Sequence, residues 1–111
     1  MKFDNSTRSK YDYVGDFYNG FARIMLNDKW GFINQNGEEI ISPKYDDVWN
    51  FEEGLALVVL KDKFGYVNEE GDEIIPVKYD MAGRFKNGFA MVQLNGKKII
   101  INENGEEVEG N

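Results

Sequence analysis

The stretch Lys29-Trp30-Gly31-Phe32-Ile33-Asn34 decides the fold because it returns along the chain. It reappears 34 residues later as Lys63-Phe64-Gly65-Tyr66-Val67-Asn68, and a divergent third copy begins at Lys97. A fixed period of this length is the signature of a tandem-repeat protein, in which each unit buries its apolar face against the next. The chain therefore predicts a stack of similar units.

The rest of each period aligns as well. Lys-Tyr-Asp opens each unit at positions 10, 44 and 78, and Phe-x-x-Gly follows at 17, 51 and 85. These markers divide the chain into a leader or cap, residues 1–9, and one domain of three repeats, 10–43, 44–77 and 78–111. Repetition assigns a structural role to Trp30, Gly31, Tyr45, Gly54, Phe64, Gly65, Tyr79 and Gly88.

Each Phe-x-x-Gly precedes a segment with the alternation of a β-strand that has one buried face. Ala22, Ile24 and Leu26 form the apolar set in the first unit, and equivalent sets follow in the other two. A two-residue turn at 27–28 predicts a hairpin, as does Asn-Gly at 95–96. This turn pairs Ile24 with Gly31, so the glycine is expected to admit a close approach by a neighbouring element.

A third strand is expected after the turn at Asn34–Gly37, beginning with Glu39-Ile40-Ile41, and its copy begins at Glu73. We expect Pro43 and Pro76 to end these strands, because proline cannot donate to a sheet ladder. The segment leading to the next unit fits either a short strand or one helical turn. Since no stretch shows a sustained 3.6-residue period, the predicted fold class is all-β: stacked antiparallel meanders without a long helix.

The third unit differs from the others in a way that suits the end of an array. Lys98 stands where the earlier units have Trp30 and Phe64, and Glu109 stands where they have isoleucine. Polar substitution in a terminal unit keeps the exposed end of a repeat array soluble. We therefore expect the third unit to act as a C-terminal cap.

With Lys-Trp-Gly-Phe-Ile-Asn, Pro-Lys-Tyr-Asp and Phe-x-x-Gly in this order, the chain resembles the bacterial WG-repeat family over residues 10–108. The naming dipeptide is intact at Trp30-Gly31, relaxed at Phe64-Gly65 and lost at Lys98-Ile99. The resemblance implies a β-rich tandem-repeat fold without a common enzymatic activity. It supplies no catalytic residues, so any function taken from it is an analogy.

Composition limits the classes of function that the chain can have. The chain has 111 residues, no cysteine, no histidine and a net charge of −7. These features argue against disulfides, ordinary zinc sites, histidine-based catalysis and direct nucleic-acid binding. No apolar run is long enough for a membrane helix, and the N-terminus shows no secretory signal. For a complete chain, we expect a cytoplasmic location.

Carboxylates are the only plentiful catalytic residue type. Asp12, Asp46 and Asp80 recur after a tyrosine, where an aspartate is expected to accept backbone N–H groups at a turn. Asp46-Asp47 and the acidic residues 69–73 contain oxygen ligands for a cation, but they lack the EF-hand spacing. We therefore predict no catalytic residue, no metal site and no cofactor.

Binding is indicated instead by positions where the repeats disagree. Trp49 aligns with Gly15 and Gly83, so the scaffold itself does not require a large aromatic there. Such positions gather on the connecting segments, where loops tend to carry function. Trp, Tyr and Arg are also the usual anchors of protein interfaces. The candidate binding residues are Tyr13, Tyr18, Asp47, Trp49, Glu52, Glu53 and Arg84. The alternative for Trp49 is that it fills a gap between units.

The first hypothesis is a non-enzymatic repeat module for protein–protein binding. Unit 44–77 carries nine acidic and three basic residues, a net charge of −6, which suits a basic protein partner. A stand-alone inhibitor or immunity protein for a basic partner is a second hypothesis. A third is carbohydrate or cell-wall ligand binding in aromatic slots between repeats. The sequence leaves the oligomeric state open, as well as the choice between an open array and a closed barrel.

Overall fold

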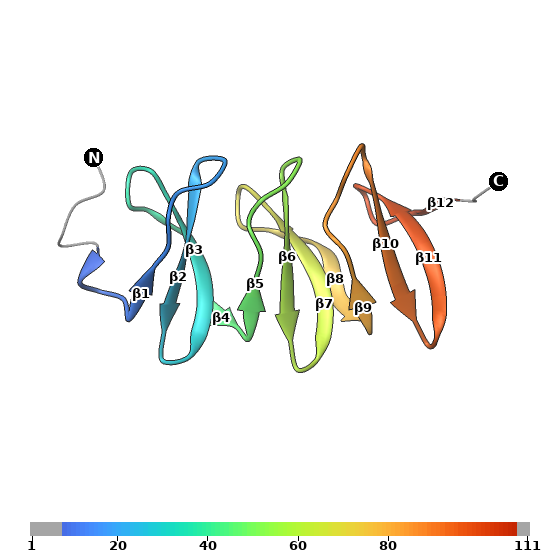
Figure 1. Ribbon diagram of the computed structural model, residues 1–111, viewed down its shortest axis with the longest axis horizontal. Helices are drawn as coiled ribbons and strands as arrows, with labels where there is room; N and C mark the ends of the chain where they lie inside the picture. The colour runs from blue at the N-terminus through green and yellow to red at the C-terminus, as the bar shows by residue number, and fades with distance from the viewer. Residues whose placement is uncertain (1–7, 109–111) are drawn as a thin grey trace.

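The computed structural model describes residues 8–108, which form three four-stranded antiparallel sheets set in a row (Figure 1). The row is elongated, with extents of 50 × 26 × 19 Å. Each sheet corresponds to one period of the repeat, although the first and second sheets end two residues inside the following unit, at Tyr45 and Tyr79, and no long helix occurs among the described residues. The strands are β1 (Tyr13–Val14), β2 (Phe21–Leu26), β3 (Lys29–Asn34) and β4 (Glu39–Tyr45) in the first sheet; β5 (Asp47–Val48), β6 (Leu55–Leu60), β7 (Lys63–Asn68) and β8 (Glu73–Tyr79) in the second; and β9 (Met81–Ala82), β10 (Phe89–Leu94), β11 (Lys97–Asn102) and β12 (Glu107–Val108) in the third.

The central hairpin of each sheet has the predicted turn and register. In the first sheet Leu26 pairs with Lys29 and Ile24 pairs with Gly31. Both turn residues have positive φ angles, 55° at Asn27 and 67° at Asp28, as a type I′ turn requires. The less typical pair Lys61-Asp62 adopts the same geometry, with φ angles of 53° and 67°. Strand pairing therefore imposes the turn even where the local residues favour it less.

The prediction that the prolines end the third strand is wrong. β4 runs through Pro43 to Tyr45, and β8 runs through Pro76 to Tyr79. Both strands lie at a sheet edge and shift register around the proline, since Phe32 pairs with Ile41 but Trp30 pairs with Tyr45. The extra residues form a bulge in which proline sacrifices no ladder hydrogen bond.

The bulge explains the glycine of the Trp-Gly dipeptide. A Cβ atom at Gly31 would lie 2.1 Å from the carbonyl oxygen of Ile41, and one at Gly65 would lie 2.6 Å from that of Ile75. The predicted close approach is thus made by the backbone of the bulged edge strand. The third sheet has Ile99 at this position, and its described edge pairs, Ile100 with Val108 and Ile101 with Glu107, keep a regular register.

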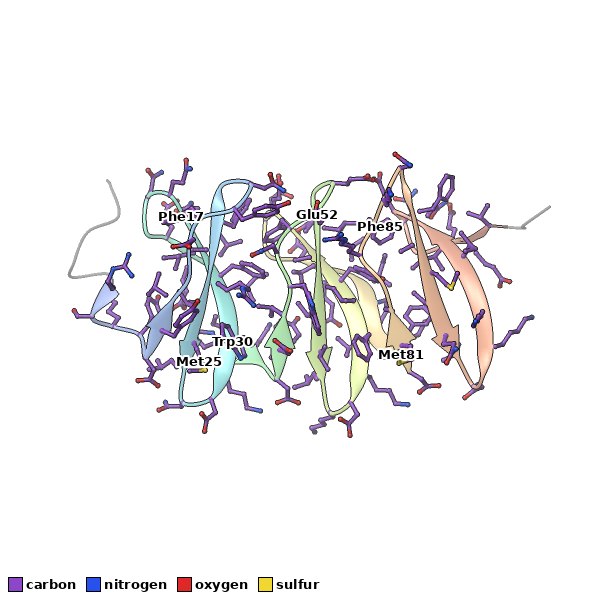
Figure 2. All side chains as sticks on the ribbon, viewed as in Figure 1. Phe17, Met25, Trp30, Glu52, Met81 and Phe85 are labelled. Atoms are coloured by element: carbon purple, nitrogen blue, oxygen red, sulfur yellow. The ribbon has the colours of Figure 1, made fainter. Side chains whose placement is uncertain are left out.

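The core consists of layers between neighbouring sheets. Phe32, Ile41 and Tyr45 of the first sheet pack against Ala56 and other residues of the second sheet. The second sheet repeats this arrangement, because Leu57, Tyr66 and Tyr79 pack against Ala90, Val92 and Ile101 of the third. Ala22, Ala56 and Ala90 are all buried, as equivalent positions in a stack should be. Phe17 and Phe85 occupy matching places in the first and third repeats (Figure 2).

The connecting segments begin with the two-residue strands β1, β5 and β9, which settles the choice between a short strand and a helical turn. At the start of the array, Tyr11, Val14 and Phe17 pack on the first sheet and leave Ala22 fully buried. At the other end Lys98 is exposed, in line with a polar cap, whereas Glu109 lies outside the described residues. The same end also exposes apolar side chains that the sequence did not lead us to expect.

Candidate functional site

Stacking places equivalent connecting segments of successive repeats beside one another. The Tyr18 hydroxyl donates a 3.0 Å hydrogen bond to Oε2 of Glu52, which is 34 residues later and therefore at the equivalent position of the next repeat. Asn19 Nδ2 likewise donates to the Phe51 carbonyl oxygen across 2.8 Å. Residues that differ between aligned repeats thus contact one another. Polar and aromatic side chains from successive repeats are therefore combined on this side of the array.

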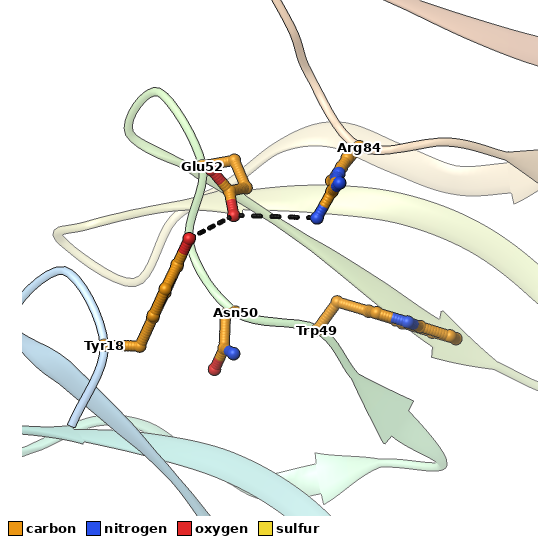
Figure 3. Close-up of a pocket in the computed structure, with 5 residues that line it drawn as sticks. All are labelled: Tyr18, Trp49, Asn50, Glu52 and Arg84. Carbon is orange, nitrogen blue, oxygen red and sulfur yellow. Dashed lines mark hydrogen bonds and ion pairs between the residues drawn. The ribbon is translucent and has the colours of Figure 1, made fainter. Parts of the chain in front are cut away.

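Five side chains from all three repeats surround a shallow pocket of about 260 Å³, which we call the Trp49 pocket (Figure 3). Two further hollows adjoin it. One has a volume of about 270 Å³ and lies between Trp49, Phe64 and Gly83; the other, of about 260 Å³, lies beside Glu53 and Lys86. Arg84 borders all three hollows. The lining of the Trp49 pocket is Tyr18, Trp49, Asn50, Glu52 and Arg84.

Trp49 lies on the surface rather than in the core. Its side chain is 44% exposed, and its ring centroid lies 6.4 Å from that of Phe64. The Trp49 backbone N–H donates to the Leu57 carbonyl oxygen across 2.9 Å, so the position of the residue is fixed by the sheet. The indole therefore presents an exposed apolar surface on a backbone that the sheet holds in place.

Glu52 is the polar centre of the pocket. Its Oε2 atom accepts the hydrogen bond from Tyr18 and lies 3.9 Å from a guanidinium nitrogen of Arg84. The hydrogen bond to the carboxylate, followed by the charge of Glu52, raises the pKa of the Tyr18 hydroxyl. Arg84 is too far away for a hydrogen bond, so its guanidinium keeps its donors available to another group.

Of the other candidate residues, Glu53 borders the hollow beside Lys86. Its carboxylate accepts hydrogen bonds from the backbone N–H groups of Asn87 and Gly88 in the next repeat, the latter at 2.7 Å. Glu53 therefore joins two connecting segments. Its position in the repeat does not by itself show that its side chain lies near the pocket.

Tyr13 and Asp47 lie outside the Trp49 pocket. Tyr13 is exposed and packs its ring against Trp30, with 5.6 Å between centroids, while the Arg23 guanidinium lies 5.3 Å from the centre of the Trp30 ring. Asp47 accepts a local hydrogen bond from the Val48 N–H. The structure thus gathers five of the seven candidate residues and places these two elsewhere.

Asn50 is a pocket residue that the sequence analysis did not select. Its signal was present, because it aligns with Asp16 and Arg84, and the three repeats therefore disagree at this position. Within residues 8–108 no group of three or more Asp or Glu side chains is arranged to hold a metal ion. No helix in this part of the chain has the length and apolar character needed to span a bilayer.

Three similar sheets, each covering the next, define a β-repeat protein whose connecting segments border a group of shallow hollows. The family model of the WG containing repeat matches three consecutive stretches, residues 9–30, 30–64 and 64–97. The chain therefore belongs to the WG containing repeat family. Comparisons with curated proteins and with solved structures returned no match. The family is defined by its repeat and not by a catalytic motif.

Proposed function

We propose that this chain is a non-enzymatic repeat module for protein–protein binding and that the Trp49 pocket is its contact surface. One observation carries the proposal. Tyr18, Trp49 and Arg84 come from three different repeats and break the repeat pattern, yet they line one exposed hollow. A scaffold that needed only to fold would not require such residues at these positions, because Gly15 and Gly83 take the place of Trp49 in the other repeats.

The electrostatics favour a basic partner. The unit that holds Trp49 has a net charge of −6, while the pocket itself combines the carboxylate of Glu52 with the guanidinium of Arg84. An acidic surface raises the association rate of a basic protein, and the mixed charges in the pocket select its orientation. An inhibitor of a basic protein is one form of this function. A neighbouring gene that encodes such a protein would favour that form.

The test is capture of a partner from the native host by immobilised chain, followed by affinity measurement with the purified partner. Trp49→Ala should weaken binding by about tenfold or more, as the loss of an aromatic anchor does. Because the indole is 44% exposed, the melting temperature should fall by only a few degrees. Ile74→Ala is the matched control: Ile74 is also exposed but does not line the pocket. Undiminished binding by Trp49→Ala, or a large melting loss, would contradict the proposal.

A further inference from the structure

The outer face of the third sheet is apolar and uncovered by any described residue. Of the seven large apolar side chains that are exposed within residues 8–108, three lie on this face: Met81, Phe89 and Met91. Met81 and Met91 also border a shallow groove of about 320 Å³ whose rim includes Lys98. Met81 is seen at the lower end of β9 in Figure 2.

Comparison with the preceding repeat shows that this exposure is not an ordinary property of the position. Leu55 and Leu57, the equivalents of Phe89 and Met91, are only 7% and 5% exposed because the third sheet covers them. Phe89 and Met91 are 47% and 53% exposed. The outer face of the third sheet is therefore the same surface that forms the inter-repeat interface elsewhere, but without its cover.

Two side chains through which the second sheet contacts the third repeat are replaced on this face. In the second sheet the Tyr66 hydroxyl donates to the Gly83 carbonyl oxygen of the next repeat, and Ile100 at the equivalent position of the third sheet cannot do so. Lys98 replaces the aromatic residue that Phe64 supplies in the second sheet. The apolar area is kept while these two contacts of the second sheet are lost, which favours a different kind of occupant.

Charge favours a second copy of the chain at this end. The unit 78–111 has five basic and five acidic residues, whereas the middle unit has a net charge of −6. Two copies that meet through their third sheets, at one end of an array 50 Å long, keep their acidic middle units apart by more than the Debye length of about 8 Å at physiological ionic strength. Repulsion between two acidic molecules is therefore least in this orientation.

The opposite end of the array limits how such an assembly can grow. Ala22, Ile24 and Ile33 on the first face of the array are fully buried, with Tyr11 and Phe17 packed against them. A head-to-tail contact would have to displace that cover, whereas a contact between two third sheets uses only surface that is already exposed. Identical faces in contact give a closed twofold dimer instead of a filament.

We infer that the outer face of the third sheet is a self-association surface through which two copies of this chain form an end-to-end dimer. The groove on this surface shares no lining residue with the Trp49 pocket. The inference does not depend on the proposed function. A dimeric module would present two pockets to its partner and gain avidity without any new contact.

The test is the molar mass of the purified full chain, measured by sedimentation equilibrium over a range of concentrations. The wild-type chain should approach twice its 12.8 kDa monomer mass as concentration rises. Met91→Glu buries an unpaired charge at the contact and should raise the dissociation constant by at least about tenfold. Ile74→Glu adds the same charge at an exposed apolar position in the middle sheet and should leave the dissociation constant unchanged. A wild-type chain that remains monomeric, or equal effects of the two substitutions, would overturn the inference.

A second measurement protects the test against misfolding of the charged variant. Because the chain has no cysteine, Met91→Cys and Ile74→Cys each create a single reactive thiol. A short bismaleimide should link two copies of Met91→Cys and not two copies of Ile74→Cys. Equal crosslinking of both variants would indicate nonspecific association, and the proposed dimer would then be wrong.

Discussion

At the scale of single residues, the glycine of the Trp-Gly dipeptide is tied to the proline of the neighbouring edge strand. The glycine is needed because the edge strand bulges at proline and brings its carbonyl oxygens over the hairpin, to 2.6 Å from a Cβ atom placed at Gly65. The obstacle is backbone, which cannot rotate away as a side chain can. Glycine and proline are therefore two parts of one local structure, and the third repeat has neither.

This coupling predicts that Gly65→Ala destabilises the chain strongly. Adding a methyl group against fixed backbone should lower the free energy of unfolding by about 3 kcal/mol. Gly83→Ala is the control, since the nearest atom to its added Cβ would be the Met91 carbonyl oxygen at 3.8 Å, an ordinary contact. Its effect should stay within about 0.5 kcal/mol. Urea unfolding followed by circular dichroism measures both, and similar losses in the two variants would refute the clash.

Single residues also show where sequence reasoning could reach the candidate site. Disagreement between aligned repeats selects Trp49, Tyr18 and Arg84 from the sequence alone, and these three residues line one pocket. The same criterion also selected Tyr13, which instead packs on Trp30. A mismatch indicates that the scaffold does not dictate the residue. It does not say which side of the array the side chain joins, because that depends on how neighbouring repeats are stacked.

At the scale of elements, the recurring aspartates join each hairpin to its neighbours. Asp46 accepts a hydrogen bond from the Lys61 N–H at 2.8 Å and from Lys29 Nζ of the preceding hairpin at 2.5 Å. Asp80 repeats the arrangement with the Asn95 N–H and Lys63. In both cases the lysine hydrogen bond, followed by the backbone hydrogen bond, lowers the pKa of the carboxyl group. These contacts confirm the expectation that the aspartates accept backbone N–H groups at turns.

The sign of the pH effect follows from these shifts. A carboxyl group whose pKa is lower in the folded state contributes stability above its unfolded pKa, here 3.8, and this contribution is lost as the pH falls through the folded pKa. Replacing Asp46 and Asp80 together by asparagine should therefore flatten the acid side of the melting-temperature curve below about pH 4. The measurement is thermal unfolding between about pH 7 and pH 2.

The control for the pH experiment is Asp16→Asn at an exposed position of the first connecting segment. This variant should keep the acid dependence of the wild-type chain. If the double variant also keeps this acid dependence, the two aspartates do not contribute to acid sensitivity and their hydrogen bonds do not stabilise the folded state. Because both groups are exposed and the ion pairs are screened, the loss of stability near neutral pH should be small, and the flattening of the acid side, which reports the same free energy, should be correspondingly modest.

Strands and turns were predictable where a short stretch of sequence determines them. Asn-Gly turns and alternating apolar residues specified the hairpins and their register, and even Lys61-Asp62 followed the pattern. The rule that proline ends a strand failed at Pro43 because the rule applies to a strand with hydrogen-bonded neighbours on both sides. β4 is an edge strand and has a neighbour on one side only. At an edge with a bulge, the missing N–H of proline has no partner to lose. Periodicity alone does not show which strand is the edge strand.

At the scale of the whole molecule, the order of the sheets follows from complementary faces. Each interior interface sets large side chains of one sheet, such as Leu57 and Tyr66, on small ones of the next, such as Ala90 and Val92. The sequence predicted this stacking from the period. It did not predict the exposed Phe89 and Met91, because the equivalent Leu55 and Leu57 are buried and only the stack shows that no described residue covers this face of the third sheet.

A nearest-neighbour stack predicts that the array can be lengthened from within. Duplicating residues 44–77 sets the second repeat on a copy of itself. The receiving face then has Phe51, Ala56, Val58 and Val67 where the third repeat has Phe85, Ala90, Val92 and Ile101. Because the two faces are alike, the added repeat should dock and bring one more buried interface. The denaturation midpoint should rise, and the urea m-value should increase by roughly one third with the added surface.

The matched control is the same duplication with Ala56→Asp in the inserted copy, where the charge would lie in the new interface without a partner. That chain should not gain stability over the three-repeat protein, because an unpaired buried charge opposes docking of the inserted repeat. Equal gains from both constructions would mean that the added stability comes from chain length and not from complementary faces. An unchanged midpoint in the duplicated chain with native Ala56 would contradict the prediction. It would show that stability depends on features of the two ends of the stack and is not a sum of equivalent contacts between neighbouring repeats.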